Sequence, residues 1–241
     1  MNLSVEALKT FSSSKSLNEY AQIVGVRETR YPSLHEFPQT LYLEPRLLGD
    51  FKKNILLTTK DGLERAELIY DTSGDISTRQ FIMGKKNIII PSQGVYFGKK
   101  PLFFYHTHFP FSEKERHKYG VDKGDESKFS VTDVFNYIEN PRLGFIYGVG
   151  SKEGATFLLQ TKKSAGIPFS SFLRWNINTA KAVVDAFLSR QKYIFAPPLS
   201  GPSSPYEKWG LAVYIWRPRP QEFDQAQLTS GIFLKLLNSV T

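Results

Sequence analysis

Cysteine is absent from the 241-residue chain, and histidine occurs four times. The lack of thiols excludes disulfide scaffolds, thiol nucleophiles, cysteine-ligated zinc fingers and iron–sulfur sites. A metal site would therefore need histidine and carboxylate ligands. Long hydrophobic runs are also missing, since no stretch approaches the ~18 apolar residues of a membrane-spanning helix. Residues 1–20 carry acidic residues where a signal peptide needs an apolar stretch. We expect an intracellular, cytoplasmic protein with no membrane partner.

The sequence also lacks the motifs of several enzyme classes. It contains no G-x-x-x-x-G-K-[ST] phosphate loop, no G-x-G-x-x-G, no G-x-S-x-G elbow and no H-E-x-x-H helix. Nucleotide hydrolases, Rossmann dehydrogenases, serine hydrolases and thermolysin-like proteases therefore lack support. Zinc nucleobase deaminases need cysteine ligands and an H-x-E motif, and both are absent.

The composition is that of a globular protein with a basic balance. Apolar residues make up 41% of the chain and aromatic residues 14%, while 31 Lys and Arg against 23 Asp and Glu give a net charge of +8. The basic residues form scattered pairs instead of a stripe, which favours solubilising charge. Nucleic-acid binding remains an alternative, because aromatic residues that could stack on bases lie near arginines. These residues are Trp175, Trp209, Tyr214 and Trp216, with Arg174, Arg217 and Arg219.

Strand-like runs interspersed with helical patterns predict a mixed α/β (α+β) fold with a central β-sheet. Proline-rich residues 31–45 favour extended coil or an edge strand, and the charge-balanced residues 112–128 predict a solvated loop. We expect strands at 55–59, 66–70, 76–83, 87–90, 101–108, 144–148, 156–161 and 211–216, and helices within 4–24 and at 130–138, 172–193 and 224–238.

We divide the chain into three parts. Residues 1–40 are expected to form an N-terminal helical and extended decoration, and residues 41–195 the main domain. Residues 196–241 begin with a proline-rich loop and are expected to add a strand and a helix that pack on the main domain. We favour a strand at 211–216 that completes the sheet over one that forms a partner interface.

His106 and His108 lie two residues apart at the end of the apolar run PLFFYHTHFP. The strand period of two places both imidazoles on one face of a sheet. With a carboxylate from a nearby element, they would supply three ligands of a tetrahedral zinc and leave the fourth position open. Asp133, near the start of the helix expected after the polar loop, is the candidate carboxylate. The alternative is a strand end that carries two histidines without binding a metal.

These residues resemble the JAMM zinc motif of the JAB/MPN domain metalloproteases. That motif runs from a glutamate in E-x-x-G-L, through H-x-H at a strand end, to S-x-x-D at the start of a helix. The matching residues here are Glu64 in ERAELI, His106 and His108 in YHTHFP, and Ser130 and Asp133 in FSVTDV. The resemblance covers roughly residues 40–165, and implies an MPN-like sheet flanked by helices, with N-terminal helical and C-terminal extensions.

The resemblance implies a zinc-dependent peptidase or isopeptidase. Zinc (Zn²⁺) held by His106, His108 and Asp133 would lower the pKa of a coordinated water and polarise the scissile carbonyl. Glu64 would accept the proton of that water, and Ser130 would donate a hydrogen bond to the oxyanion. The substrates of the family are isopeptide bonds to ubiquitin-like proteins or peptide bonds, so the expected partner is a protein or peptide.

The sequence departs from the family pattern in three ways. Glu67 replaces the expected glycine, which makes it an alternative base to Glu64. Pro110 comes one position late, and an insertion lengthens the 25-residue interval from His108 to Asp133, so that a loop would overhang the site.

Other readings of the same residues stay open. Ser130 and Asp133 also fit a helix capping box. His117 is a weaker candidate for a third imidazole ligand, and His35 is given no role. The main functional alternative is an inactive MPN-type structural subunit of a larger complex.

Overall fold

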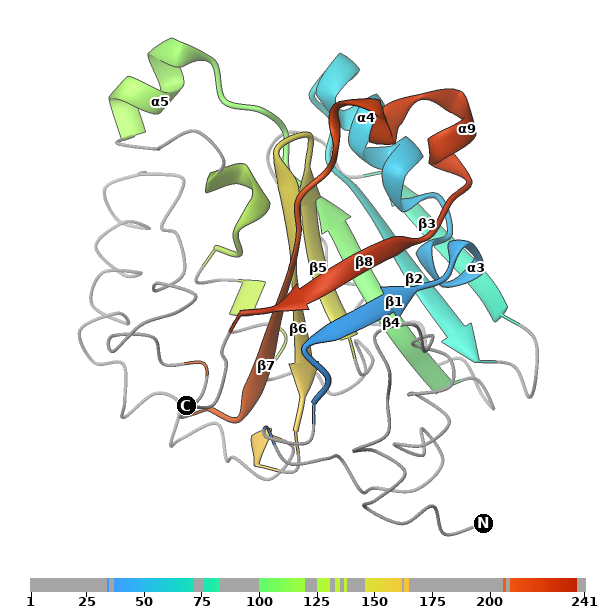
Figure 1. The fold of residues 1–241 in the computed structure, drawn as a ribbon. Helices are drawn as coiled ribbons and strands as arrows, with labels where there is room; N and C mark the ends of the chain where they lie inside the picture. Colours follow the sequence, from blue (N-terminus) through green and yellow to red (C-terminus); the bar gives the residue numbers. More distant parts are fainter. Residues whose placement is uncertain are drawn as a thin grey trace, which may run out of the picture.

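The centre of the fold is an eight-stranded mixed β-sheet, seen in the computed structural model of the chain (Figure 1). The structure describes residues 34, 37–71, 76–82, 100–119, 125–130, 133, 134, 137, 146–161, 163, 164, 206 and 209–237. The strands are β1 (Thr40–Leu43), β2 (Arg65–Asp71), β3 (Ile76–Ile82), β4 (Lys100–Thr107), β5 (Ile146–Ser151), β6 (Gly154–Gln160), β7 (Leu211–Trp216) and β8 (Ile232–Leu236). Their order in the sheet is β1-β8-β7-β6-β5-β4-β2-β3.

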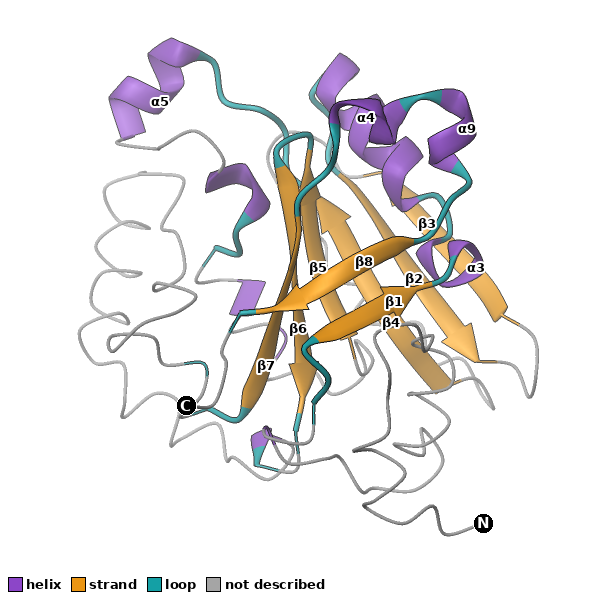
Figure 2. Ribbon diagram, viewed as in Figure 1, coloured by secondary structure: helices purple, strands orange, loops and turns teal. Residues whose placement is uncertain are grey.

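Neighbouring strands run antiparallel except β4 and β5, which are parallel. Short helices lie around this sheet (Figure 2). They are α3 (Pro45–Leu48), α4 (Phe51–Asp61), α5 (Glu113–Tyr119) and α9 (Gln225–Leu228), with 3-10 turns η2 (Asp125–Ser127) and η5 (Pro220–Phe223). The mixed α/β class predicted from the sequence is confirmed.

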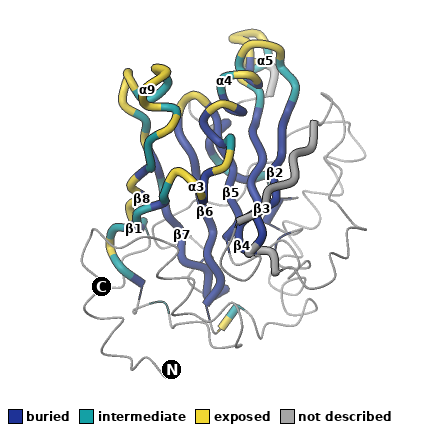
Figure 3. The backbone as a smooth tube through the Cα atoms, turned by 90° about the vertical axis from the view of Figure 1, so that its right-hand side faces the viewer, coloured by how far each residue is buried: buried dark blue, intermediate teal, exposed yellow. Residues whose placement is uncertain are grey.

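The two faces of the sheet carry separate hydrophobic cores. On one face, Phe51 and Ile55 of α4 pack with Phe103 and Phe157 of the strands. On the other face, a second cluster contains Phe104, Phe129, Tyr147, Leu158 and Tyr206. Figure 3 shows the central strands almost wholly buried, whereas parts of α5 and α9 are exposed. Because strand residues alternate between faces, Phe103 and Tyr105 face α4, and Phe104 and His106 face the second core.

Six predicted strands are confirmed, with shifted ends: 66–70, 76–83, 101–108, 144–148, 156–161 and 211–216 correspond to β2 through β7. β1 is the edge strand expected within residues 31–45, and β7 lies inside the sheet between β6 and β8. Asp133, Val134 and Tyr137 are helical, as expected for 130–138. The helices predicted within 4–24 and at 172–193, the strand at 87–90 and the loop at 196–205 lie outside the described residues.

The strand predicted at 55–59 is wrong, because these residues belong to helix α4. Phe51 and Ile55, four residues apart, are buried on one side of α4, while Leu57 is 36% exposed. Gly62 ends the helix with a φ of 69° and donates its N–H to the Thr58 carbonyl. A left-handed glycine at this position is a common helix terminator.

The terminal helix predicted at 224–238 is also wrong. Only the one-turn helix α9 forms there within the described part of the chain, and strand β8 follows it. Ile232, Leu234 and Leu236 are buried, while Phe233 between them is 59% exposed. This alternation is the strand period of two, and β8 pairs with β1 and β7.

The solvated loop predicted at 112–128 is wrong in two places, since α5 and η2 lie within it. Ser112 and Glu115 cap the start of α5: the Glu115 N–H donates to Ser112 Oγ, and the Ser112 N–H donates to the Glu115 carboxylate. Glu126 of η2 is buried. Among the described residues, no helix has the length and apolar character needed to cross a membrane.

Candidate metal centre

His106 and His108 come from the end of β4, on the face opposite α4. His106 pairs with Val149 of the parallel strand β5. His108 follows the last residue of β4, and its backbone N–H donates to the Gly150 carbonyl at 2.9 Å. Because this bond extends the β4–β5 ladder by one residue, both imidazoles are fixed on the same side of the sheet.

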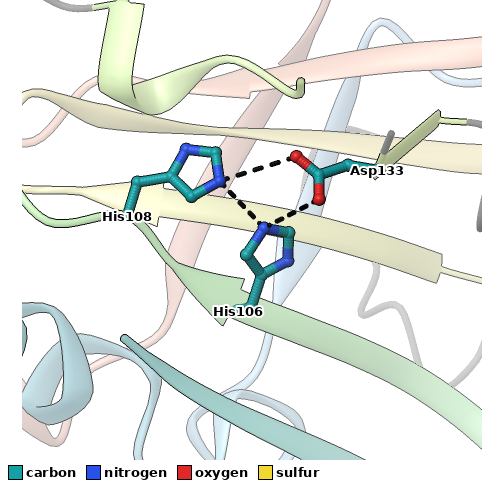
Figure 4. Close-up of side chains that lie close together, drawn as sticks. All are labelled: His106, His108 and Asp133. Carbon is teal, nitrogen blue, oxygen red and sulfur yellow. Dashed lines mark hydrogen bonds and ion pairs between the residues drawn. The ribbon is translucent and has the colours of Figure 1, made fainter. Parts of the chain in front are cut away.

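Asp133 reaches these histidines from the short helix after η2 (Figure 4). The Nε2 atoms of His106 and His108 lie 2.9 Å apart. Asp133 Oδ1 is 3.3 Å from His106 Nε2, and Oδ2 is 3.5 Å from His108 Nε2. The three residues, all buried, offer ligand atoms that lie within 4.8 Å of one another. The structure therefore brings together the three predicted metal ligands.

The spacing of these atoms fits a small metal ion. Ligand atoms at the corners of a tetrahedron around zinc, with bonds of about 2.0–2.1 Å, lie about 3.3 Å apart. The two Nε2 atoms are 2.9 Å apart, and they lie 3.3 and 3.5 Å from the two different oxygens of Asp133, which is close to this value. With one atom taken from each residue, the three ligand atoms lie within 4.8 Å of one another. In addition, apart from its 3.3 Å approach to His106 Nε2, Asp133 Oδ1 has no hydrogen-bond partner among the described residues. A buried carboxylate oxygen without such a partner is costly, and a cation between the three side chains would compensate it.

The remaining ring nitrogen of His108 is also fixed. Its Nδ1 lies 3.1 Å from the backbone carbonyl oxygen of Glu126. Histidines that bind metals commonly donate their second N–H to a carbonyl or carboxylate. Nδ1 of His106 is buried and has no hydrogen-bond partner in the described part of the chain.

Ser130 and Asp133 form the capping box that the sequence left open as an alternative. The Asp133 N–H donates to Ser130 Oγ at 3.1 Å, and both the N–H and the hydroxyl of Ser130 donate to Asp133 Oδ2 at 2.7 Å. Asp133 makes these capping hydrogen bonds and its contacts with the two histidines at the same time. Ser130 therefore holds the Asp133 carboxylate in the orientation that faces the two imidazoles.

The charges in the site stabilise one another. Burial alone would raise the pKa of Asp133, but the charge of His106 and the contacts with both imidazoles hold this pKa well below its ordinary value. Burial alone would lower the pKa of His108, but Asp133, Glu64 and the Glu126 carbonyl raise it. Asp133 is thus an anion beside two imidazoles, and these side chains can bind a metal cation when both rings are neutral.

Glu64 precedes β2 and is 7% exposed. Burial raises the pKa of Glu64, the charges of His108 and His106 lower it, and that of Asp133 raises it again. Burial is the largest of these influences, and the charge contributions come from the three candidate ligands, so Glu64 shares their electrostatic environment. Glu67, the alternative base, turns to the α4 face, where its carboxylate accepts hydrogen bonds from the Asp50 N–H and the Tyr105 hydroxyl.

An aromatic cluster that the sequence analysis missed lies beside His106. Tyr147 of β5 stacks on Phe104, Phe129 and Tyr137, with ring centroids 5.0–5.5 Å apart. Its ring centroid is 5.7 Å from that of His106. Burial, followed by the charges of Asp133 and Glu64, raises the pKa of Tyr147 well above its usual value. The apolar run around residue 147 predicted a strand, but no local pattern linked it to the histidines.

The structure does not bring the other candidate residues to this site. His117 is exposed on α5. Trp209, Tyr214 and Trp216, considered for base stacking, are at most 5% exposed. Their ring faces are therefore not available to nucleic-acid bases. His35, Arg174 and Trp175 lie outside the described residues.

Comparisons of this chain with protein-family models, with curated proteins and with solved structures return no match. The site itself is therefore the basis for inferring a function.

Proposed function

We propose that this chain is a zinc-dependent hydrolase of peptide or isopeptide bonds, with an MPN-like arrangement of its site. The observation that carries the proposal is the buried convergence of His106, His108 and Asp133. Two imidazoles and one carboxylate form the ligand set of many catalytic zinc sites, which keep a fourth position for water or substrate.

The order of the elements supports the MPN-like part of the proposal. Helix α4 precedes Glu64, the antiparallel pair β2 and β3 follows it, and β4 ends in the two histidines. The S-x-x-D segment then starts a helix, and β5 returns parallel to β4. This is the order in which the resemblance to the JAMM motif places a glutamate, two histidines and an aspartate.

Each residue of the site has a defined task in this proposal. His106, His108 and Asp133 would hold the ion, which supplies Lewis acidity when bound. Glu64 would accept a proton from the attacking water and pass it to the departing amine, and the pKa raised by burial suits it to this task. Ser130 directs its hydroxyl to Asp133, so it would serve as oxyanion donor after that hydroxyl turns to the substrate.

Zinc content by elemental analysis tests the metal part. We expect about one zinc per chain in the wild-type protein and in His117→Ala, which removes an exposed histidine on α5. We expect His106→Ala to contain none, because a buried ligand is lost. A wild-type protein that takes up no zinc after supplementation would sink the proposal.

Hydrolysis assays test the catalytic part. The zinc-loaded protein is incubated with mixed-sequence fluorogenic peptides and with isopeptide-linked ubiquitin dimers. We expect cleavage that a zinc chelator removes and added zinc restores. A protein that binds zinc and cleaves neither substrate would instead support the inactive structural subunit.

A further inference from the structure

Glu126 connects the insertion between the histidines and Asp133 to the site. It lies in η2, within the region expected from the sequence to be a solvated loop, yet it is 1% exposed. Its backbone carbonyl oxygen is 3.1 Å from His108 Nδ1. The insertion therefore supplies a direct neighbour of a candidate ligand.

This contact decides which nitrogen of the His108 ring carries the hydrogen. A carbonyl oxygen only accepts hydrogen bonds, so the hydrogen of the neutral ring lies on Nδ1. The lone pair then lies on Nε2, which faces His106 Nε2 at 2.9 Å and Asp133 Oδ2 at 3.5 Å. Metals bind histidine through such a lone pair. The position of the Glu126 carbonyl thus prepares Nε2 of His108 for a cation.

The Glu126 side chain fixes this carbonyl from the side of α5. Its buried carboxylate accepts a hydrogen bond from the Phe111 N–H at 3.2 Å and pairs with the guanidinium of Arg116. Arg116 Nε also donates to the Phe111 carbonyl at 3.2 Å. The Arg116 side chain is 19% exposed, whereas Lys114 and His117 on the same helix are exposed. Arg116 therefore links α5 to the segment that contacts His108.

The next residue fixes the same turn from the sheet side. The Ser127 carbonyl accepts a hydrogen bond from Thr156 Oγ1 at 2.6 Å, and Ser127 Oγ accepts one from Arg217 Nη1 at 3.2 Å. Glu126 is thus held between α5 on one side and, through Ser127, strand β6 and the residue after β7 on the other. Loss of the contacts on one of these two sides would allow the Glu126 carbonyl to move relative to His108.

We propose that the Arg116–Glu126 ion pair positions the imidazole of His108 for metal binding, so that the insertion is a working part of the site. This inference rests on the proposed function, because it assigns Arg116 and Glu126 to the same metal centre. Both are positioning residues that act through His108. Removal of such an outer partner typically weakens metal binding by about 10–100-fold.

The test compares zinc affinity, by competition with a chromophoric chelator, in the wild-type chain, Arg116→Met and Lys114→Met. Lys114→Met removes the same charge from an exposed position of α5. We expect a zinc Kd about 10–100-fold higher in Arg116→Met and an unchanged Kd in Lys114→Met. Because Arg116→Met removes an ion-pair partner from a buried carboxylate, the double variant Arg116→Met/Glu126→Gln is measured beside it, with circular dichroism to verify folding.

A second readout requires no metal. Nitrogen-15 NMR of the histidine rings at pH 9 reports the tautomer, and four histidines permit assignment. We expect His108 to carry its hydrogen on Nδ1 in the wild type and to become a tautomer mixture in the variants. Folded variants with wild-type Kd and wild-type tautomer would overturn the inference and leave the proposed function intact. A wild-type protein that binds no zinc would contradict the proposed function. In that case the inference would be tested only by the His108 tautomer in the wild type and in the variants.

Discussion

Glu64 and Glu67 are three residues apart, and both are buried, yet their surroundings differ in kind. Glu67 points to the α4 face. Its carboxylate accepts a hydrogen bond from the Asp50 N–H at 3.0 Å and another from the Tyr105 hydroxyl, to which Asn54 donates at 2.8 Å. Burial, followed by the charge of Glu67, raises the pKa of Tyr105 well above its ordinary value, so this hydroxyl remains a donor.

Glu64 lies on the other side of the strand, and its pKa is set by burial and by the charges of His108, His106 and Asp133. No hydrogen-bond donor among the described residues contributes to that pKa. A carboxylate that accepts hydrogen bonds from fixed donors is held in one place, whereas a buried carboxylate influenced by the charges of the candidate ligands is a candidate for proton exchange. Burial alone therefore does not mark a carboxylate as a candidate catalytic acid, because the two buried glutamates differ in their partners.

The largest expected effect is on turnover. Glu64→Gln should reduce kcat by at least about 10²–10⁴-fold, because the amide cannot accept the proton, while zinc content stays at the wild-type value. The matched control is Glu67→Gln, which makes the same chemical change on the opposite face. Steady-state kinetics and elemental analysis of both variants check this. If Glu67→Gln abolishes turnover and Glu64→Gln does not, the assignment of the base is reversed.

The second expected effect is on stability. Glu67→Ala should lower the free energy of unfolding by about 2–4 kcal/mol, because the Asp50 N–H and the Tyr105 hydroxyl each lose a buried acceptor. Urea denaturation followed by circular dichroism measures this. Glu64→Ala is the control and should lower the free energy of unfolding by a smaller amount, since fewer hydrogen bonds are lost. Equal losses in the two variants would contradict the division into a structural and a catalytic glutamate.

The site was more predictable than the fold around it. The period of two in a strand is local, so PLFFYHTH was sufficient to place His106 and His108 on one face. The approach of Asp133 depends on non-local packing; its place at the start of the expected helix made it a candidate, and the resemblance to the JAMM motif supported that choice. The contact between His108 and Glu126 could not be predicted. It is made by a backbone carbonyl, which every residue has, so the amino-acid type at this position gives no indication of it.

Helix α4 shows why parts of the fold were missed. Its buried side includes Lys52 and Asn54, which hydropathy assigns to the surface. Lys52 is 1% exposed because its ammonium group donates to Glu222 and Ser230, both at 2.9 Å. These partners lie more than 150 residues away in sequence. Because Lys52 and Asn54 are polar but buried, the hydropathy of the sequence does not reveal the helical period of α4. The apolar residues after Asn54 therefore resembled a short strand.

The smallest expected effect concerns pH and the start of β2, where Arg65 lies between the two glutamates. Arg65 donates to Asp61 at 2.5 and 2.9 Å. This hydrogen bond, and next the one from the Leu63 N–H, lower the pKa of Asp61 from 3.8 to about 2. Because the folded pKa is the lower one, the stabilisation is complete above pH 3.8 and is lost as the pH falls through about 2. In urea denaturation, the free energy of unfolding of the wild type should therefore be slightly larger than that of Asp61→Asn at neutral pH. This difference should disappear near pH 2. Glu113→Gln, a change at an exposed carboxylate of α5, controls for general charge effects. A difference that persists unchanged at acid pH would show that Asp61 stabilises the α4–β2 connection without its charge.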